Sequence, residues 1–362
     1  MEFCDLKMQY AAYQAEIDSA IRSVLLSSAF INGPEVKALE GELASFCGAK
    51  HVMACANGTD AIHVALLALG IRPGDEVIVP DFTFYATAEM VALVGATPVF
   101  ADIDSVTFNI TAATVEARIT PRTKGIIPVS LFGQIPDLDG IGALAAARGL
   151  WVMEDGAQSF GADQRGKRSC ALTRVATTSF FPAKPLGCYG DGGALFSSDD
   201  ALAASIRTLL NHGSTQRYHH SVVGVNSRLD SIQAAVLRVK LKHFESELKQ
   251  RDRAARMYTE RLAGKVVTPA VREGNFSAWA QYTIRVPNRD RMQAHLQGKG
   301  IPTAVHYPIP MHAQAAFAHL GIKDGQCPVA SQAAREVMSL PMHGMLAEAQ
   351  IDAICSAVKE GL

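Results

Sequence analysis

A single lysine, Lys184, lies in a stretch whose composition gives the backbone a fixed shape. An apolar run from Val175 to Phe181 predicts a buried strand that ends at Pro182, and Pro185 follows the lysine. Proline fixes φ, and the glycine-rich run from 187 to 193 permits close backbone approach or positive φ. A lysine held there can lose hydration, which lowers its pKa and makes its amine a nucleophile. One lysine alone leaves an ordinary loop residue open as the alternative.

A carboxylate is predicted beside this lysine. The segment from Trp151 to Met153 predicts another buried strand, and Glu154 and Asp155 stand at its carboxyl end. Ligands of open α/β sheets bind at the carboxyl ends of strands, so Asp155 and Lys184 would face one crevice. An amine for a Schiff base and a carboxylate for a pyridinium nitrogen are the two groups that pyridoxal 5'-phosphate requires. The pair is compatible with such a cofactor site, although the spacing by itself does not establish it.

A second candidate site follows the predicted strand from His51 to Ala56. The turn Asn57-Gly58-Thr59-Asp60 leads into an apolar helix, so free N–H groups and the helix dipole would favour an anion there. The Thr59 hydroxyl would add a further donor. A plain helix cap is the alternative at this position.

Six motifs make the chain resemble the DegT/DnrJ/EryC1/StrS family of sugar aminotransferases, which are fold-type I pyridoxal phosphate enzymes. Together these motifs run through most of the chain. They are Ala56 to Asp60, Glu154 to Gln158, Ser179 to Gly187, Gly190 to Gly193, Gly224 to Arg228 and Val305 to Pro308. The closest resemblance is to the subgroup that aminates a UDP-linked 3-keto hexuronic acid for bacterial surface polysaccharide such as the O-antigen of lipopolysaccharide.

The resemblance implies roles for individual residues. Lys184 would bind pyridoxal 5'-phosphate as a Schiff base and move the proton, and Asp155 would hold the ring nitrogen. The remaining cofactor contacts would come from Gly58, Thr59, Ser179 and Asn226 at the phosphate, Phe84 stacked on the ring and Gln158 near its phenolic oxygen. Asn226 would reach across a homodimer interface, with a helix cap as its alternative.

The resemblance also implies the substrates: a UDP-sugar acceptor, most specifically UDP-2-acetamido-2-deoxy-3-keto-D-glucuronic acid, and an amino-acid donor, L-glutamate. Arg228 is the candidate for the sugar carboxylate, and His306 and Tyr307 would face the sugar. Arg228 could instead pair with Asp230 or a glutamate of its own helix, and His306 could be a core histidine.

Three other functions stay open alongside this one. A 4-keto-6-deoxy sugar nucleotide is the alternative acceptor. Some members of the superfamily are dehydratases with histidine at the lysine position, which Lys184 argues against. A non-catalytic regulatory protein is the alternative from another class.

Composition narrows the functional classes. The 362 residues carry 34 basic and 35 acidic side chains, a net charge of −1, which argues against a nucleic-acid or membrane-surface binder. The N-terminus lacks the pattern of a signal peptide, and no apolar run approaches the length of a membrane span. Seven cysteines without a C-x-x-C motif favour reduced thiols over disulfides or a metal site. We therefore expect a cytoplasmic enzyme without a metal.

Alternating strand and helix patterns predict the elements that position these residues. A mostly parallel central sheet flanked by helices would form a large domain over residues 1–245, and residues 246–362 a smaller C-terminal α/β domain. Residues 227–262 predict two long helices, the second with a mostly solvated charged face. The predicted strands after His51 are Glu76 to Pro80, Thr97 to Ala101, Lys124 to Ser130, Trp151 to Met153, Val175 to Phe181, Gln281 to Val286 and Thr303 to Tyr307. No G-x-G-x-x-G or P-loop motif accompanies them.

Overall fold

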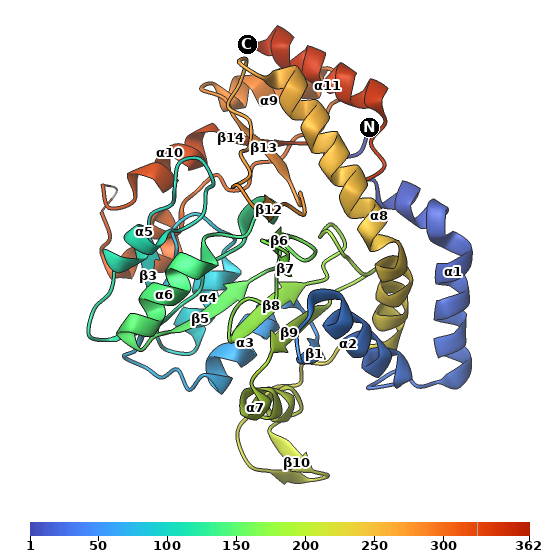
Figure 1. The fold of residues 1–362 in the computed structure, drawn as a ribbon, viewed down its shortest axis with the longest axis vertical. Coiled ribbons are helices and arrows are strands. Elements are labelled where there is room, and N and C mark those ends of the chain that lie inside the picture. Colours follow the sequence, from blue (N-terminus) through green and yellow to red (C-terminus); the bar gives the residue numbers. More distant parts are fainter. Residues whose placement is uncertain (324) are drawn as a thin grey trace.

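A seven-stranded sheet forms the centre of the protein, as seen in the computed structural model, which describes residues 1–323 and 325–362 (Figure 1). Its spatial order is β1-β9-β8-β5-β4-β2-β3. The strands are β1 (His51–Cys55), β2 (Glu76–Pro80), β3 (Thr97–Ala101), β4 (Thr123–Ile126), β5 (Trp151–Asp155), β8 (Val175–Ser179) and β9 (Gly193–Ser197). All neighbours are parallel except β9, which runs antiparallel to both β1 and β8. The mostly parallel sheet is confirmed.

Both faces of this sheet are buried. Met53 and Cys55 of β1 pack into one hydrophobic cluster, whereas Val52 and Ala54 pack into another. Because successive side chains of a strand point to opposite faces, helices must cover both sides. The helices of this part are α1 (Leu6–Ser27), α2 (Pro34–Cys47), α3 (Gly58–Ala68), α4 (Ala86–Leu93), α5 (Ala112–Glu116), α6 (Leu138–Arg148) and α7 (Asp200–Leu210), with a 3-10 turn at η1 (Leu131–Gly133).

One long helix, α8 (Ser231–Leu262), replaces the two helices predicted over residues 227–262. The segment contains neither glycine nor proline, so nothing in it ends a helix once Asp230 has capped its N-terminus. Its charged face is mostly exposed as predicted, but Glu247 and Arg251 are buried. The predicted domain boundary at residue 245 falls inside this helix. The division into 1–245 and 246–362 stays a prediction.

The C-terminal part has its own hydrophobic cluster, built around Tyr258, Tyr282 and Ile354. Its elements are β13 (Tyr282–Arg285), α9 (Arg289–Gly298), η2 (Met311–Ala313), η3 (Ala315–Leu320), α10 (Pro328–Glu336), β14 (Val337–Leu340) and α11 (Glu348–Gly361). The predicted strand from Thr303 to Tyr307 is wrong. Only Ala304 forms an isolated bridge, to Ser339, and the backbone bends at His306.

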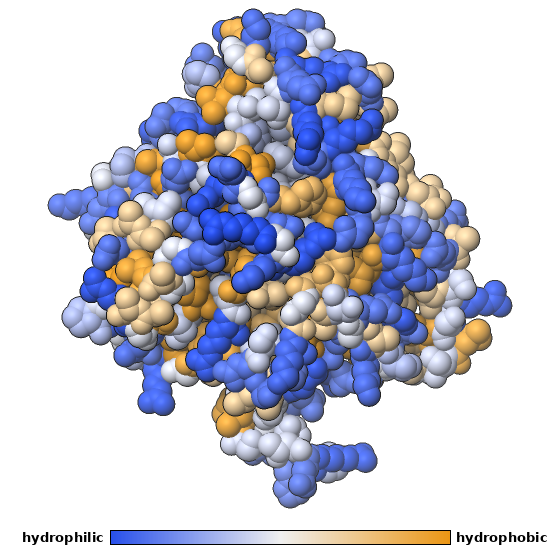
Figure 2. All heavy atoms as spheres, viewed as in Figure 1, coloured by the Kyte–Doolittle hydropathy of each residue, from blue (hydrophilic) through white to orange (hydrophobic). Residues whose placement is uncertain are grey.

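Short strands complete the fold: β6 (Asp163–Gln164), β7 (Lys167–Arg168) and β12 (Asn275–Phe276) form one small sheet, and β10 (Ser214–Gln216) and β11 (His219–His220) form a protruding hairpin. Figure 2 shows a surface on which hydrophilic side chains predominate, with hydrophobic patches between them. Among the described residues, no helix has the length and apolar character needed to cross a membrane.

Candidate active site

The structure brings Asp155 and Lys184 to the same edge of the sheet. Asp155 is the last residue of β5 and pairs in register with Thr177 of the neighbouring strand β8. Lys184 follows β8 in a turn closed by its own N–H, which donates to the Phe181 carbonyl at 2.9 Å. Burial raises the pKa of the Asp155 carboxyl and lowers the pKa of the Lys184 amine. The charge of Asp155 raises the Lys184 pKa and that of Lys184 lowers the Asp155 pKa, so each group lies within range of the other's charge.

Thr87 holds the Asp155 carboxylate in place. The Thr87 hydroxyl, on the first turn of α4, donates a 2.8 Å hydrogen bond to Asp155 Oδ2, and the Ala157 N–H donates to Oδ1 at 3.1 Å. Both bonds favour the ionised form and lower the Asp155 pKa against the effect of burial. Thr87 was not among the site residues predicted from the sequence. Its position three residues after Phe84, at the start of a helix, was the available signal.

Glu154, the neighbouring carboxylate, points to the other face of β5 and has a different environment. Its Oε1 accepts hydrogen bonds of 2.7 Å from the hydroxyls of Ser130 and Ser169. Its Oε2 accepts from the Cys170 N–H at 2.8 Å. Burial raises its pKa, and these donors lower it. Glu154 therefore satisfies buried donors and is turned away from Lys184.

Gln158 and Tyr307 close one side of the crevice. Gln158 Nε2 donates to the Tyr307 hydroxyl at 3.0 Å, and Gln158 Oε1 accepts from the Phe132 N–H at 2.7 Å. Burial raises the Tyr307 pKa, so its hydroxyl keeps its proton. The Phe84 ring lies 6.0 Å from that of Tyr307, and Phe84 is 54% exposed although it lies on a sheet edge lined by buried residues. The Phe84 ring is thus more than half exposed beside Tyr307.

The N-terminus of α3 lies against the end of β8. A Cβ added to Gly58 would come within 2.7 Å of Ser179 Cβ, so only glycine permits this approach. Asn57 caps the helix by accepting a 2.7 Å hydrogen bond from the Asp60 N–H. The N–H groups of Gly58 and Thr59 precede the first intrahelical bond and remain available. This cradle of N–H groups beside two hydroxyls, from Thr59 and Ser179, fits a phosphate.

Asn226 and Arg228 flank Ser227, whose hydroxyl accepts a 3.1 Å hydrogen bond from the Ala56 N–H directly before the turn into α3. Asn226 is exposed and pairs through its backbone with Asn211. It does not cap α8, because Asp230 does so by accepting from the Gln233 N–H. Arg228 is half-buried and forms no ion pair with any residue in 1–323 or 325–362, so the suggested pair with Asp230 is absent there.

His306 lies close enough to Lys184 to be influenced by its charge. Its Nδ1 lies 2.9 Å from the Ser339 hydroxyl. Burial and the Lys184 ammonium lower its pKa to about 4, so the ring is neutral at neutral pH. It presents an uncharged hydrogen-bonding ring beside Tyr307, whose ring centre is 5.7 Å away.

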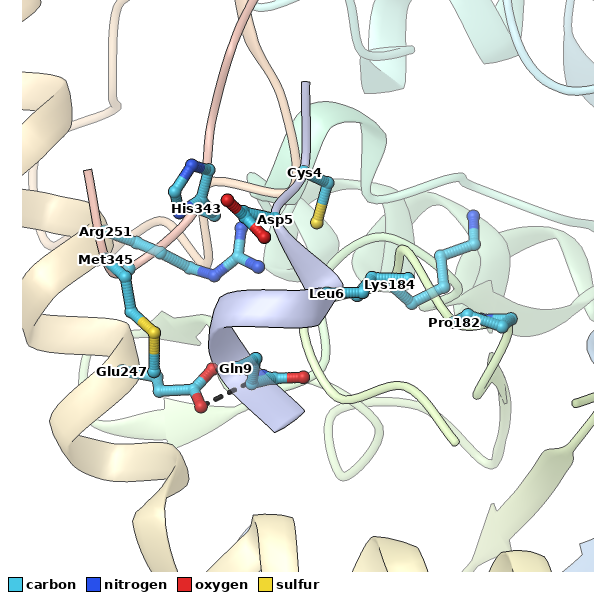
Figure 3. Close-up of a pocket in the computed structure, with 11 residues that line it drawn as sticks. Cys4, Asp5, Leu6, Gln9, Pro182, Lys184, Glu247, Arg251, His343 and Met345 are labelled. Carbon is cyan, nitrogen blue, oxygen red and sulfur yellow. Dashed lines mark hydrogen bonds between the residues drawn. The ribbon is translucent and has the colours of Figure 1, made fainter. Parts of the chain in front are cut away.

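A small pocket lies behind the turn that carries Lys184, between the N-terminal segment and α8 (Figure 3). Asp5, Gln9, Glu247, Arg251 and His343 contribute its polar side chains. The amine of Lys184 points away from these residues. Lys184 thus lines this pocket with its backbone side, while its amine is directed elsewhere.

Comparison with known proteins agrees with this geometry. The sequence model of the DegT/DnrJ/EryC1/StrS aminotransferase family matches residues 12–359. The UDP-2-acetamido-2-deoxy-3-oxo-D-glucuronate aminotransferase of Pseudomonas aeruginosa is 54% identical over 359 residues, which cover 99% of each chain.

Two solved structures have the same fold over nearly the whole chain. The S. venezuelae DesV structure in complex with a ketimine intermediate is 42% identical, with a TM-score of 0.97 over 99% of this chain and 97% of that one. The ntda structure from Bacillus subtilis with bound cofactor PMP is 30% identical, with a TM-score of 0.90 over 97% of this chain and 82% of that one.

Proposed function

The chain belongs to the DegT/DnrJ/EryC1/StrS aminotransferase family, whose members depend on pyridoxal 5'-phosphate, and we propose that its Lys184 and Asp155 operate that cofactor. The observation that carries the proposal is their position at the ends of adjacent strands, within each other's electrostatic field. When bound, the cofactor supplies a carbonyl that condenses with amines and a protonated ring that accepts electrons.

Lys184 supplies the amine that attaches the cofactor and later carries a proton. Burial lowers its pKa, which increases the neutral fraction that can act as nucleophile and base. The nearby Asp155 charge opposes this shift, so the residue can hold a proton as well as release one.

Asp155 stabilises a positive charge on the ring nitrogen. Its two oxygens already accept from Thr87 and Ala157, which fixes the orientation of the carboxylate before any ligand binds. The residues that would hold the rest of the cofactor are Gly58, Thr59 and Ser179 at the phosphate, Phe84 on the ring face and Gln158 at its edge. The fit of the N-terminal cradle of α3 to an anion supports this assignment.

The acceptor that we propose is UDP-2-acetamido-2-deoxy-3-keto-D-glucuronic acid, which is the substrate class named for the 54% identical relative. Such a sugar carries a carboxylate. Arg228, half-buried and without an ion-pair partner among the described residues, is suited to bind it bidentately. His306 and Tyr307 would contact the sugar as uncharged donors and acceptors.

We also propose L-glutamate as donor and a homodimer in which Asn226 completes the partner's phosphate site. The exposure of Asn226 and of the neighbouring Val223, at 94%, supports an additional contact there. The seven free cysteines are in keeping with a cytoplasmic location.

Borohydride reduction of the purified protein tests the assignment of Lys184. We expect the yellow absorbance to disappear and peptide mapping to find the cofactor mass on Lys184 alone. A cofactor mass on another lysine, or on none, would contradict the proposal. Lys124→Ala, at an exposed lysine, is the control that keeps both the colour and the labelled peptide.

A further inference from the structure

Lys240 of α8 is a buried charge that the proposed chemistry does not use. Its side chain is 2% exposed. Its Nζ donates a 2.6 Å hydrogen bond to the Gly187 carbonyl and lies 4.5 Å from the centre of the Tyr189 ring. Gly187 ends the turn that contains Lys184. The ammonium therefore joins the long helix to the segment that carries the proposed nucleophile.

The turn is compact and otherwise closed by bonds within itself. The Cys188 N–H donates to the Phe180 carbonyl at 2.8 Å, which joins the two ends of the turn. A Cβ on Gly187 would come within 2.4 Å of the Pro182 carbonyl oxygen, so the backbone is packed against itself. These contacts give the turn its shape, and Leu186 anchors it by packing into a hydrophobic cluster, so the bond from Lys240 is the polar contact that ties the turn to α8.

A second contact from α8 supports this role. Gln233 Oε1 accepts a 2.8 Å hydrogen bond from the Tyr189 N–H. Gln233 precedes Lys240 by two helical turns, so both side chains extend from one face of α8. The helix thus holds the chain at Gly187 and again at Tyr189, just beyond Lys184.

The charge of Lys240 is present at neutral pH. Its pKa is lowered to about 8, mainly by burial and also by Arg251, against the opposing effects of Glu247, Cys188 and Cys4. A buried ammonium adds little to stability compared with an apolar side chain of similar size. Stability alone therefore does not account for a lysine at this position.

We propose that Lys240 is a positioning residue that holds the turn from Phe181 to Gly187 so that Lys184 is directed at Asp155. The inference rests on the proposed function of Lys184. It assigns Lys240 no contact with the cofactor or substrate.

Hydrogen exchange of the apo protein tests the proposal without the cofactor. In Lys240→Met, which retains side-chain length without the donor, we expect amides of the peptide spanning 180–189 to exchange about tenfold faster than in wild type. Lys242→Met is the matched control, because Lys242 is an exposed lysine on the same helix, paired with Glu16. It should exchange as wild type does. Lys240→Arg, which keeps the charge and donors, should restore much of the protection.

The second readout is the pH titration of the cofactor absorbance attached to Lys184. We expect Lys240→Met to shift its midpoint, and Lys242→Met to leave it unchanged. Should Lys240→Met not fold, Lys240→Gln carries the same two measurements. Wild-type exchange of the turn in the variant, or an unchanged midpoint, would overturn the proposal. A wild-type protein without cofactor on Lys184 would instead contradict the proposed function, whatever the exchange shows.

Discussion

The Thr87 hydroxyl lies 2.8 Å from Asp155 Oδ2, so a helix and a strand that are 68 residues apart in the chain meet at one carboxylate. This bond is buried, and it opposes the rise in pKa that burial causes. The Thr87 bond thereby favours the ionised form of Asp155 and orients its carboxylate in a place where water cannot stabilise the charge.

Replacing Thr87 by Val removes this donor at constant size. Since the bond lowers the Asp155 pKa, its loss should raise that pKa and move the acidic limb of the kcat/KM profile to higher pH, by about one unit. We expect kcat to fall by about tenfold. Thr87→Ser retains the hydroxyl and should keep the wild-type profile. An unchanged acidic limb in Thr87→Val would show that the hydroxyl has no part in setting the charge.

Asp155→Asn and Glu154→Gln should separate function from stability in two adjacent carboxylates. The first removes the charge at the crevice, and we expect kcat to fall by about a hundred- to a thousandfold with little change in Tm. The second disturbs a fully buried acceptor of four hydrogen bonds, and should lower the unfolding free energy by about 1–3 kcal/mol. Kinetics and thermal unfolding of both variants check this. Near-normal turnover of Asp155→Asn would make its carboxylate merely structural.

His306 and His343 predict a loss of stability in acid. Burial lowers both pKa values from 6.5 to about 4. Between pH 6.5 and about 4, the unfolded chain binds protons at these histidines and the folded chain does not. The unfolding free energy therefore falls as the pH falls through this range. Thermal unfolding across this range should show a shallower fall in His343→Asn than in wild type. The exposed His319→Asn serves as control, and equal slopes in all three proteins would contradict the expectation.

Mixing Lys184→Ala and Asn226→Ala subunits tests whether the active site is shared. If Asn226 completes the partner's site, a heterodimer contains one site with both residues intact, and activity should recover to about a quarter of wild type by random pairing. Mass spectrometry of tagged subunits would verify that exchange occurred. Verified exchange without any recovery would mean that each chain builds its own site.

Arg228→Lys tests the proposed carboxylate contact. Lysine keeps the charge but loses the planar fork, so kcat/KM for the acidic 3-keto sugar should fall by about tenfold or more. A neutral 4-keto-6-deoxy counterpart, which lacks the carboxylate, should be little affected. If the wild-type enzyme prefers the neutral sugar, the acceptor is not a hexuronate, and the assignment as an aminotransferase is unaffected.

Local patterns in the sequence predicted much of the fold. β2 and β3 have the predicted bounds, because each is a short apolar run next to residues that favour turns. β9 was not predicted, because the glycine-rich segment that precedes it does not indicate that an antiparallel strand follows. Two helices were predicted in place of α8, because the charged stretch resembled a separate solvated helix. Glu247 and Arg251 of that stretch are in fact buried.

In the candidate site, too, some features could be predicted from the sequence and others could not. Lys184 and Asp155 could be found because the ends of adjacent parallel strands necessarily meet. The bonds from Thr87 to Asp155 and from Gln158 to Tyr307 join residues far apart in the chain, and no local pattern specifies them. The burial of Lys240 could not be predicted either, because it depends on how the turn from Phe181 to Gly187 packs against α8.

The continuity of α8 determines how the protein loses its structure on heating. Leu237 and Phe244 belong to the cluster beneath the sheet, and Tyr258 and Leu262 belong to the C-terminal cluster. A helix whose last turns lose their packing frays back along its length, because isolated helical turns are marginal in water. Unfolding of the C-terminal cluster would thus spread along α8 to the residues around Lys240. The two parts should therefore unfold in one cooperative transition. A substitution that stabilises the C-terminal end of α8 should also keep the turn around Lys184 folded to a higher temperature.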